Sequence, residues 1–574
     1  MMGIRISFFV AVQLIFKTVF AQDFYTGVDL SYVNEMEDCG AIYSDLSGAA
    51  TDPYTLFNQE GADLVRLRLW HDPDWTGYSN LDDVKISISR AKHAVIVVIL
   101  YFHYSDFWAD PGRQWRPAAW ENVESDVVLG DSVYNYTYNT LLELNADGLL
   151  PRMVQIGNET NGNILQPRND ANIDSGSSNL YPVDWSRQVN LLQRGLDAVH
   201  DFNENFSSAM ETIIHIANPI DASSWFTSAA ENGLSDFDII GLSYYPQWHD
   251  LGVRELGEYV SDMKNQFSKE VIIVETGYPW TTSNANDNAN NVLGFDSRLF
   301  TYSNTFSIST QRDFLVELTW LVKENGGLGV VYWEPAWIST SCQSYWAAGS
   351  HWDNATLFDF DGKLHSGADF LSYDYSQMPS ALNDHQVTFI VDMTAIDTSK
   401  GVYVTGDFTG SSWQLLPMDA VQDNLYELQT LIPGRTSGAY IFHNDDNFDD
   451  SSRESVPDQC AAVWDTHREY RVQDEDVQFY FSWGRCDQQP NEIVLSIDED
   501  LSEVFIYPTI TTDFIKIENK GEVMRYDLLD AAGKVIEQNI LTPREVNVTH
   551  LKSGPYYLRL NSSSGVRTVR FIKQ

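Results

Sequence analysis

Short runs of nearly continuous apolar residues recur along the first two thirds of the chain, and each is followed by a polar loop and a stretch of helical periodicity. The runs are rich in Val, Ile and aromatic residues, which is typical of parallel strands covered on both faces. Eight strands are predicted, at residues 25–30, 64–70, 95–102, 152–156, 212–216, 239–243, 271–275 and 328–333. Helical periodicity is clearest at residues 81–93, 186–200 and 310–324.

Eight strand–helix units within residues 22–378 predict an α/β domain that closes into a (β/α)8 TIM barrel. The alternative is an open, doubly wound sheet, which typically carries a glycine-rich phosphate loop after its first strand. Because no such loop follows residues 25–30, the barrel is favoured.

The pattern changes after Tyr373, where short alternating strands are separated by Gly, Pro and Asp turns. Residues 384–488 are therefore predicted to form an antiparallel β-sandwich, with strands at 387–392, 401–406, 425–431, 438–443 and 477–483. Residues 492–574 carry a third set of short strands and are predicted to form a separate β-domain. Two small all-β domains are thus expected after the barrel.

The first 21 residues have the features of a secretory signal peptide. Arg5 supplies a positive charge, residues 6–16 form an apolar stretch, and residues 19–21 resemble a cleavage site. This stretch is too short to cross a bilayer, and no later stretch approaches the roughly 20 apolar residues that a transmembrane helix needs. We therefore expect an exported protein without a transmembrane segment.

Four cysteines are too few for a disulfide-rich scaffold. Cys460 and Cys486 lie in one region and could pair after export, and the sequence leaves this pairing open. Cys39 falls in a predicted first helix and Cys342 in a distant loop, so both are expected to be unpaired.

Composition narrows the classes of partner. The chain has 36 basic and 81 acidic side chains and a formal net charge of −45, which argues against nucleic acid and against anionic membrane surfaces. With 43% hydrophobic and only 20% charged residues, it has enough apolar side chains for a sizeable core. Aromatic residues make up 13%, which suggests flat apolar faces for sugar rings, although the core is the ordinary place for any single one.

In a barrel of this kind the active site lies at the C-terminal ends of the strands, and here those ends are polar or aromatic throughout. They carry Asp29, Arg66, Arg68, Trp70, His71, His103, Tyr104, Asn158, Glu159, Asn218, Tyr244, Tyr245, Glu275, Trp333 and Glu334. Polarity at every strand end is hard to explain by structure alone.

Glu159 and Glu275 follow the fourth and seventh predicted strands, so their side chains are expected to face each other across the barrel mouth. A retaining glycosidase needs two carboxyl groups roughly 5–5.5 Å apart, one as nucleophile and one as acid and then base. Either glutamate alone could instead cap a loop or form an ion pair. Both together, among aromatic residues, favour glycoside hydrolysis.

Neighbouring residues could adjust the acidity of these carboxyl groups. Arg66 and Arg68 lie two apart on one strand, hence on one face, and either could keep a nucleophile ionised or simply tie strands together. Tyr244 or Tyr245 could donate a hydrogen bond to the same carboxylate.

Other chemistries are disfavoured. His103, His215 and His249 lack the spacing of zinc ligands. Neither a Gly-x-Ser-x-Gly elbow nor a Walker loop is present, which argues against serine-nucleophile and nucleotide chemistry.

At these residues the sequence resembles the family 53 glycoside hydrolases, which are arabinogalactan endo-β-1,4-galactanases. The similar segments are VRLRLW (65–70), FHYSDFWADP (102–111), QIGNE (155–159), GLSYYP (241–246), VETGYPW (274–280) and YWEPAW (332–337). The resemblance implies a retaining barrel enzyme that cuts the β-1,4-galactan of type I arabinogalactan and pectin without a cofactor in the chemistry. It implies Glu159 as acid/base and Glu275 as nucleophile.

The resemblance also implies sugar subsites lined by His103, Asp106, Trp108, Trp248, Trp333 and Trp337. Arg66, Arg68, Asn158, Tyr244 and Tyr245 complete the predicted substrate-binding set. The alternatives are another retaining β-glycanase, such as a mannanase or xylanase, and a non-catalytic glycan-binding protein. The presence of both glutamates argues against the last.

A structural calcium ion is a further implication, because bacterial members bind Ca²⁺ in the loop after the nucleophile. Here that loop offers Asn284, Asn286, Asn288 and Asn290, and Asp353 could add a carboxylate. Ca²⁺ accepts such oxygen ligands. The aspartates and histidine of the family are missing at the first three positions, so an ordinary Asn-rich loop is the alternative.

Two further resemblances concern the C-terminal third. Segments FIYP (505–508), DFIKI (513–517), YDLLDAAGKVI (526–536) and LKSGPYYLRL (551–560) resemble the sorting domain of type IX secretion substrates, with TIT at 509–511 as a departure. This implies outer-membrane secretion machinery as a partner, export through the periplasm, and a secreted or cell-surface protein. VYVTGDF (402–408) with Trp413 is similar to starch-binding-like modules, so this module is expected to bind glycan or to serve as a spacer.

Overall fold

The computed structural model describes residues 24–168, 179–249, 251–285, 306–343, 348–378, 383–409, 413–448, 451–457, 461, 467–473 and 475–486, and, further on, 505–507, 510–511, 514–518, 523–529, 535–540, 545–552, 554–562 and 565–573. The predicted signal peptide, residues 1–21, lies outside these ranges.

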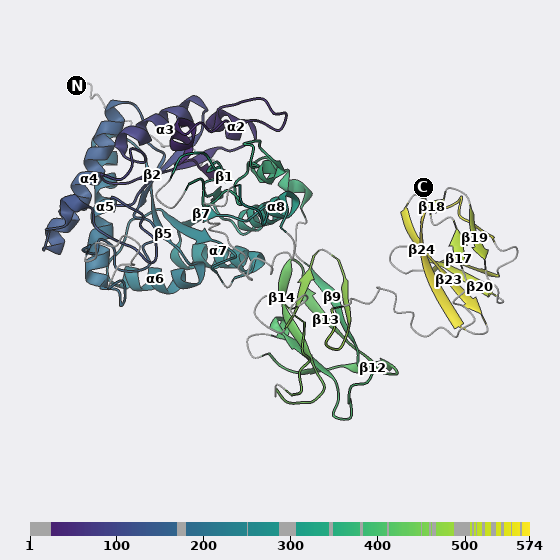
Figure 1. Cartoon of the computed structure of the whole chain (residues 1–574). Helices are drawn as coiled ribbons and strands as arrows, with labels where there is room; N and C mark the ends of the chain where they lie inside the picture. Colours follow the sequence, from purple (N-terminus) through teal and green to yellow (C-terminus); the bar gives the residue numbers. More distant parts are fainter. Residues whose placement is uncertain are drawn as a thin grey trace, which may run out of the picture.

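Eight parallel strands close into a barrel in chain order, with β8 pairing back to β1, and helices surround it (Figure 1). The predicted TIM barrel is therefore confirmed. The strands are β1 (Tyr25–Asp29), β2 (Leu64–Leu69), β3 (Val97–Phe102), β4 (Met153–Ile156), β5 (Glu211–Ile216), β6 (Ile239–Tyr244), β7 (Glu270–Thr276) and β8 (Gly329–Tyr332).

Most of the barrel helices begin where the sequence supplies a capping side chain. Asn80, Ser125, Asp184 and Ser307 each accept a hydrogen bond from a backbone N–H in the first turn of the helix that follows. The α-helices are α1 (Val33–Asp38), α2 (Pro53–Gln59), α3 (Leu81–His93), α4 (Asp126–Ala146), α5 (Trp185–Phe206), α6 (Pro219–Glu231), α7 (Val253–Phe267) and α8 (Ile308–Glu324). Short 3₁₀ helices are η1 (Ala118–Trp120), η3 (Ser366–Leu371), η4 (Tyr375–Gln377) and η5 (Asp407–Thr409).

The barrel interior changes from apolar to polar toward the C-terminal strand ends. One buried interior cluster consists of Leu64, Ile99, Met153, Ile213, Ile239, Ile272, Val274, Leu328 and Val331. Because side chains alternate along a strand, the residue two positions after Leu64 on the same face is Arg66, and Met153 and Ile213 are followed likewise by Gln155 and His215. The sequence thus places a polar layer directly above an apolar floor.

A β-bulge in β7 breaks this alternation next to Glu275. Leu242 pairs with Ile273, but the next residue of β6, Ser243, pairs with Glu275, so Val274 is the extra residue. Val274 already packs in the interior cluster, and strict alternation would turn Glu275 outward. The bulge instead lets Glu275 project into the barrel mouth.

The expectation that Cys39 and Cys342 are unpaired is wrong. They form a disulfide with a Cα–Cα distance of 5.5 Å across a sequence separation of 303 residues. Cys39 directly follows α1 and Cys342 lies after β8, so the bond joins the loops of two strands that are neighbours in the closed ring. Because the two cysteines are 303 residues apart, the sequence alone did not indicate that they lie close together. Cys486 is disulfide-bonded as well, but Cys460, its predicted partner, lies outside the described residues.

The next region forms two four-stranded sheets, β11-β10-β14-β15 and β12-β13-β9-β16, with a shared apolar core that includes Phe389, Tyr440 and Tyr470. The strands are β9 (Asp384–Asp392), β10 (Tyr403–Gly406), β11 (Leu416–Pro417), β12 (Asp419–Gln422), β13 (Leu425–Pro433), β14 (Thr436–His443), β15 (Arg468–Val472) and β16 (Val477–Ser482). The expectation of a purely antiparallel sandwich is wrong in one respect, because β16 pairs with β9 in parallel. Short strands such as β15 escaped the sequence pattern.

Barrel and sandwich meet at α8. Arg435 and Arg471 of the sandwich both lie 3.4 Å from the Oε2 atom of buried Glu317, and Arg254 of α7 donates to the Gly434 carbonyl at 2.9 Å.

The C-terminal strands form a three-stranded sheet, β17-β19-β22, and a five-stranded sheet, β18-β24-β23-β20-β21. They are β17 (Phe505–Tyr507), β18 (Ile510–Thr511), β19 (Phe514–Glu518), β20 (Val523–Leu529), β21 (Val535–Ile540), β22 (Glu545–Asn547), β23 (Gly554–Ser562) and β24 (Gly565–Lys573). Within the described part of the chain, no helix is both long and apolar enough to cross a membrane.

The disulfide is predicted to stabilise the barrel substantially. Replacing both Cys39 and Cys342 by Ser should lower the free energy of unfolding by about 2–5 kcal/mol, because the long loop between them is no longer closed in the unfolded chain. Denaturant unfolding followed by tryptophan fluorescence measures this. A reductant should lower the midpoint of the parent protein and leave the barrel transition of the double variant nearly unchanged. Equal midpoints for the two proteins would contradict the prediction.

Candidate active site

The C-terminal strand ends surround a cleft of about 570 Å³. It is lined mainly by aromatic and ionisable side chains, and aromatic walls with a few placed polar groups are typical of a site for a small ligand. The lining comprises Tyr101, His103, Trp108, Ala109, Asp110, Pro111, Arg113, Asn158, Glu159, Ala217, Tyr245, Trp248, His249, Glu275, Trp333, Trp337, His351 and Trp352.

Glu275 is held from both sides. Its Oε1 atom accepts a hydrogen bond from Arg66 Nη1 at 2.7 Å, and its Oε2 atom accepts one from the Tyr245 hydroxyl at 3.2 Å. Burial raises the pKa of Glu275, while the Arg66 charge and both hydrogen bonds oppose that rise. These contacts favour the ionised carboxylate.

Arg66 is completely buried and has a polar partner on each side. Besides Glu275, its guanidinium donates to Asp29 Oδ2 at 3.2 Å, to Gln155 Oε1 at 3.1 Å and to Asn158 Oδ1 at 2.8 Å. The same group lies 3.6 Å from the centre of the Tyr101 ring. The charge is therefore compensated and its position fixed.

Glu159 lies in an unusual backbone conformation. Its φ is +47°, in the left-handed region that few non-glycine residues adopt. Gln114 supports this turn by donating to the carbonyls of Asn158 and Glu159 at 2.9 and 3.1 Å. The side-chain Oε1 atom accepts a hydrogen bond from the Ser243 hydroxyl at 2.7 Å.

The two glutamates approach each other closely. One carboxyl oxygen of Glu159, one of Glu275 and a ring nitrogen of His215 all lie within 4.8 Å of one another. Burial raises the pKa of Glu159 well above its usual range, and the negative charge of Glu275 raises it further. Because only Glu275 is paired directly with a guanidinium, Glu275 loses its proton first and Glu159 keeps its own. One charged and one protonated carboxyl group at this spacing suit double displacement at a sugar carbon.

Several buried hydrogen-bond donors of the cleft have no partner within the described part of the chain. They are Tyr101 Oη, His103 Nε2, Trp108 Nε1, Trp337 Nε1 and Trp352 Nε1. His103 Nδ1 accepts from the Ala109 N–H at 3.0 Å, and burial holds the pKa of His103 far below its usual range, so Nε2 carries the hydrogen. Unsatisfied donors among aromatic faces suit a ligand rich in hydroxyl oxygens.

The structure places nine of the predicted site residues on the cleft wall: Glu159, Glu275, His103, Trp108, Asn158, Tyr245, Trp248, Trp333 and Trp337. Arg66 lies directly beneath. Trp248 remains 42% exposed at the rim, where a sugar can stack on it.

Three predicted substrate contacts lie elsewhere. Tyr244 is turned away from the cleft by strand alternation and donates to the Leu251 carbonyl at 2.7 Å. Arg68 pairs with buried Glu334 at 3.2 Å and stacks against Trp108, so it supports the wall from behind. Asp106 accepts hydrogen bonds from the backbone N–H groups of Asp72 and Ala118 and thereby fixes two loops. None of the three is among the residues that line the cleft, so their contact with substrate stays a prediction.

Sequence reasoning missed Ser243, Trp352 and the role of His215. Ser243 and His215 are polar residues at inward positions of otherwise apolar strands, and this signal could have identified them. Trp352 comes from a loop with no such pattern. It fits only because Gly277 has no side chain, since a Cβ there would lie 2.5 Å from the indole.

The calcium prediction falls largely on residues outside the described ranges, namely Asn286, Asn288 and Asn290. Asp353 is buried, and its Oδ2 accepts from Ser339 Oγ at 2.8 Å and from the Ala285 N–H at 3.0 Å. Its Oδ1 atom has no hydrogen-bond partner among the described residues. Asp353 thus lies against the loop that begins at Asn284, and one of its oxygens is unsatisfied.

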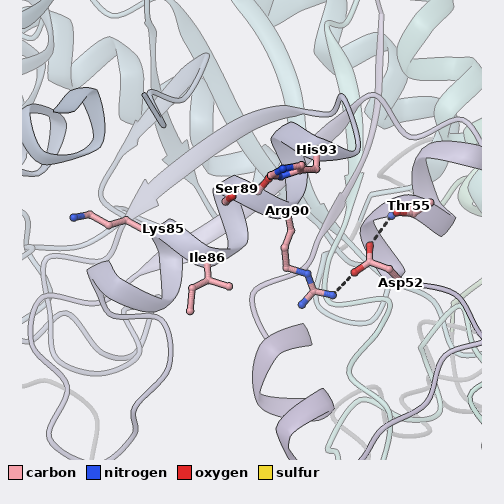
Figure 2. Close-up of a pocket in the computed structure, with 7 residues that line it drawn as sticks. All are labelled: Asp52, Thr55, Lys85, Ile86, Ser89, Arg90 and His93. Atoms are coloured by element: carbon pink, nitrogen blue, oxygen red, sulfur yellow. Dashed lines mark hydrogen bonds and ion pairs between the residues drawn. The ribbon is translucent and has the colours of Figure 1, made fainter. Parts of the chain in front are cut away.

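A second hollow, on the outside of the barrel, has a different character (Figure 2). It lies between α2 and α3, where Arg90 contacts Asp52 and Asp52 caps α2 through the Thr55 N–H. Its lining contains a single carboxylate, Asp52, so it offers no pair of acids for hydrolysis.

Comparison with known proteins agrees with the geometry. Residues 25–371 match glycosyl hydrolase family 53, and residues 505–574 match the secretion system C-terminal sorting domain. An arabinogalactan endo-β-1,4-galactanase of Cellvibrio japonicus is 45% identical over 358 residues, which is 62% of this chain and 92% of the relative. An endo-β-1,4-galactanase of Bacillus subtilis is 30% identical over 382 residues, covering 59% and 83%.

A solved family 53 catalytic domain from Ignisphaera aggregans superimposes with a TM-score of 0.54 at 31% identity and covers 62% of this chain and 97% of that domain. The family match extends over all eight barrel strands and both cleft glutamates. The chain therefore belongs to glycosyl hydrolase family 53.

Proposed function

We propose that this protein is a secreted endo-β-1,4-galactanase that hydrolyses the β-1,4-galactan of type I arabinogalactan with retention of anomeric configuration. The observation that carries the proposal is the pair of buried carboxyl groups within 4.8 Å, one of them bound to Arg66. Family membership and the galactanase relatives support the substrate.

In this mechanism Glu275 attacks the anomeric carbon while Glu159 gives its proton to the leaving glycosidic oxygen. The glycosyl–enzyme bond removes the charge of Glu275, and with it one cause of the raised pKa of Glu159. Glu159, now ionised, then takes a proton from the water that attacks the anomeric carbon, and Glu275 is released.

Aromatic side chains position the chain of sugars. Trp333 and Trp352 stand perpendicular, with ring centres 4.8 Å apart, and Trp108 and Trp337 complete the aromatic wall. The indole N–H groups of this wall that have no partner among the described residues can donate to sugar hydroxyls. The sugar and its linkage are proposed from the galactanase relatives, because the same barrel fold can also serve a mannanase or a xylanase.

The mechanism is tested by replacing each glutamate and measuring release of reducing ends from galactan, mannan and xylan side by side. The parent protein should act on galactan and give a retained product by NMR. Glu159→Ala and Glu275→Ala should each lose several orders of magnitude in rate, because no neighbour can replace either carboxylate. Inverted product, or near-normal activity of Glu275→Ala, would overturn the mechanism.

Azide distinguishes the two roles. It should restore turnover of Glu275→Ala with an inverted glycosyl azide, because azide takes the place of the nucleophile. Glu159→Ala should retain activity on substrates whose leaving group needs no proton, and azide should there give a retained product.

Activity of the parent protein on mannan or xylan in place of galactan would leave the mechanism standing and would change the proposed substrate.

We further propose a division of the chain into a signal peptide (1–21), the catalytic barrel (22–378), a glycan-binding or spacer module (384–488) and a sorting domain (492–574). The match of residues 505–574 to a sorting domain supports export to the medium or the cell surface. We propose that the protein passes through the periplasm on this route and that outer-membrane secretion machinery recognises the sorting domain.

Deleting residues 492–574 should leave the purified enzyme active and trap it inside the cell. Cell fractionation with activity assays checks this, and the same residues fused to a signal-bearing reporter serve as the matched control, which should be exported. Normal export of the truncated enzyme would contradict the proposal.

We propose, finally, that a structural Ca²⁺ is held near Asp353, whose buried Oδ1 atom has no hydrogen-bond partner among the described residues. Carboxylate and amide oxygens are suitable ligands, and the sequence carries asparagines at positions 284, 286, 288 and 290. Chelator should lower the melting temperature of the parent protein, and added Ca²⁺ should restore it. Asp353→Asn should reduce both effects, and a melting temperature that is indifferent to chelator would refute the proposal.

A further inference from the structure

Two buried residues form a hydrogen-bonded chain that ends on Glu159. Ser243 of β6 lies 2.7 Å from Glu159 Oε1, and His215 of β5 lies 2.8 Å from the Ser243 hydroxyl through its Nε2 atom. Ser243 and His215 are both fully buried and are not among the residues that line the cleft. Ser243 reaches the reaction through Glu159, while His215 also contacts Gln155 and Asn158, which both bond to Arg66.

The direction of this chain follows from the surroundings of His215. Its Nδ1 atom accepts a hydrogen bond from the Glu159 N–H at 3.3 Å. Gln155 Nε2 lies 3.2 Å from the same atom and shares its two hydrogens among Nδ1, the Gly157 carbonyl and Asn158 Oδ1. Asn158 Oδ1 is also near, at 3.1 Å, but it already accepts hydrogen bonds from Arg66 and Gln155. Nδ1 is therefore an acceptor, and the hydrogen of the ring resides on Nε2.

The remaining hydrogens are then fixed. His215 Nε2–H donates to the Ser243 oxygen, so the hydroxyl hydrogen of Ser243 points to Glu159 Oε1. Burial, together with the charge of Arg66 and the neighbouring ring of His103, holds the pKa of His215 far below its usual range. The imidazole therefore stays neutral near neutral pH, and the hydrogen bonds run in one direction, from His215 through Ser243 to Glu159.

We propose that His215 and Ser243 are positioning residues that reserve Glu159 Oε1 as a hydrogen-bond acceptor, so that the catalytic proton resides on Oε2. In the first step the Oε2 proton passes to the glycosidic oxygen as the bond to the anomeric carbon breaks. In the second step water returns a proton to Oε2 as its oxygen bonds to that carbon. This inference rests on the proposed role of Glu159 as acid/base.

A second effect follows from the same contact. Burial and the charges of Glu275 and Asp110 raise the pKa of Glu159. The Ser243 hydrogen bond stabilises the ionised form and so lowers this pKa, as does the charge of Arg66. Without the hydroxyl, Glu159 should hold its proton to higher pH.

The test compares Ser243→Ala with the parent protein on two substrates. On galactan, kcat should fall by about 10- to 100-fold, because the acid is no longer oriented. The basic limb of the kcat/KM profile should move upward by about half to one pH unit, the equivalent of one hydrogen bond. On an aryl galactobioside with an acidic phenol, which needs no proton, the glycosylation rate should change less than threefold.

Conservative variants separate orientation from packing. Ser243→Thr retains a hydroxyl and should restore the basic limb, and His215→Gln retains a donor toward Ser243 and should lose less than His215→Leu. Melting temperatures show whether each variant is folded. Equal losses on both substrates, or a basic limb that does not move in folded Ser243→Ala, would overturn the inference.

A direct titration gives a readout that does not need activity. In a Glu275→Gln background, ¹³C NMR of labelled glutamate should show a Glu159 pKa that rises when Ser243→Ala is added. An unchanged Glu159 pKa would refute the positioning role of Ser243. It would not affect the proposal that the protein hydrolyses galactan. No release of reducing ends from galactan by the parent protein would instead remove the proposed function, and full activity of Glu159→Ala would remove its acid/base role, so the failures are distinguishable.

Discussion

The buried guanidinium of Arg66 is the constraint on which the active site depends. A charge without a partner inside a barrel is costly, and removal of one partner of such a pair typically destabilises a protein by about 3–5 kcal/mol. Arg66 of β2 satisfies this demand with Asp29 of β1, Gln155 of β4 and Glu275 of β7. The position of the nucleophile is thus coupled to the integrity of the ring.

The same charge also separates the roles of two chemically identical side chains. Glu275 bonds directly to the guanidinium, whereas the nearest donor to Glu159 is the neutral hydroxyl of Ser243. Burial raises the pKa of both, but the compensation is unequal. A difference in environment over less than 5 Å therefore produces a nucleophile and an acid from two glutamates.

Periodicity alone predicted the barrel, because eight buried strands and their helices leave a strong repeating pattern. It also placed Arg66, Glu159 and Glu275 at strand ends. It did not reveal the bulge at Val274 that turns Glu275 inward, since a bulge depends on how two strands pair. It left Tyr244 and Tyr245 undecided, although strand alternation turns Tyr244 outward and leaves Tyr245 to bond Glu275. It missed Trp352, which reaches the cleft only because Gly277 is small.

The bond between Cys39 and Cys342 has a consequence for a protein exposed to proteases. Surface loops are the usual sites of proteolytic cleavage, and most loops of the barrel lie between these two cysteines. A single cut in any of them leaves two fragments that remain covalently joined at the seam between β1 and β8. A barrel that has been cut once can therefore keep its eight strands together, because the disulfide still joins the two fragments.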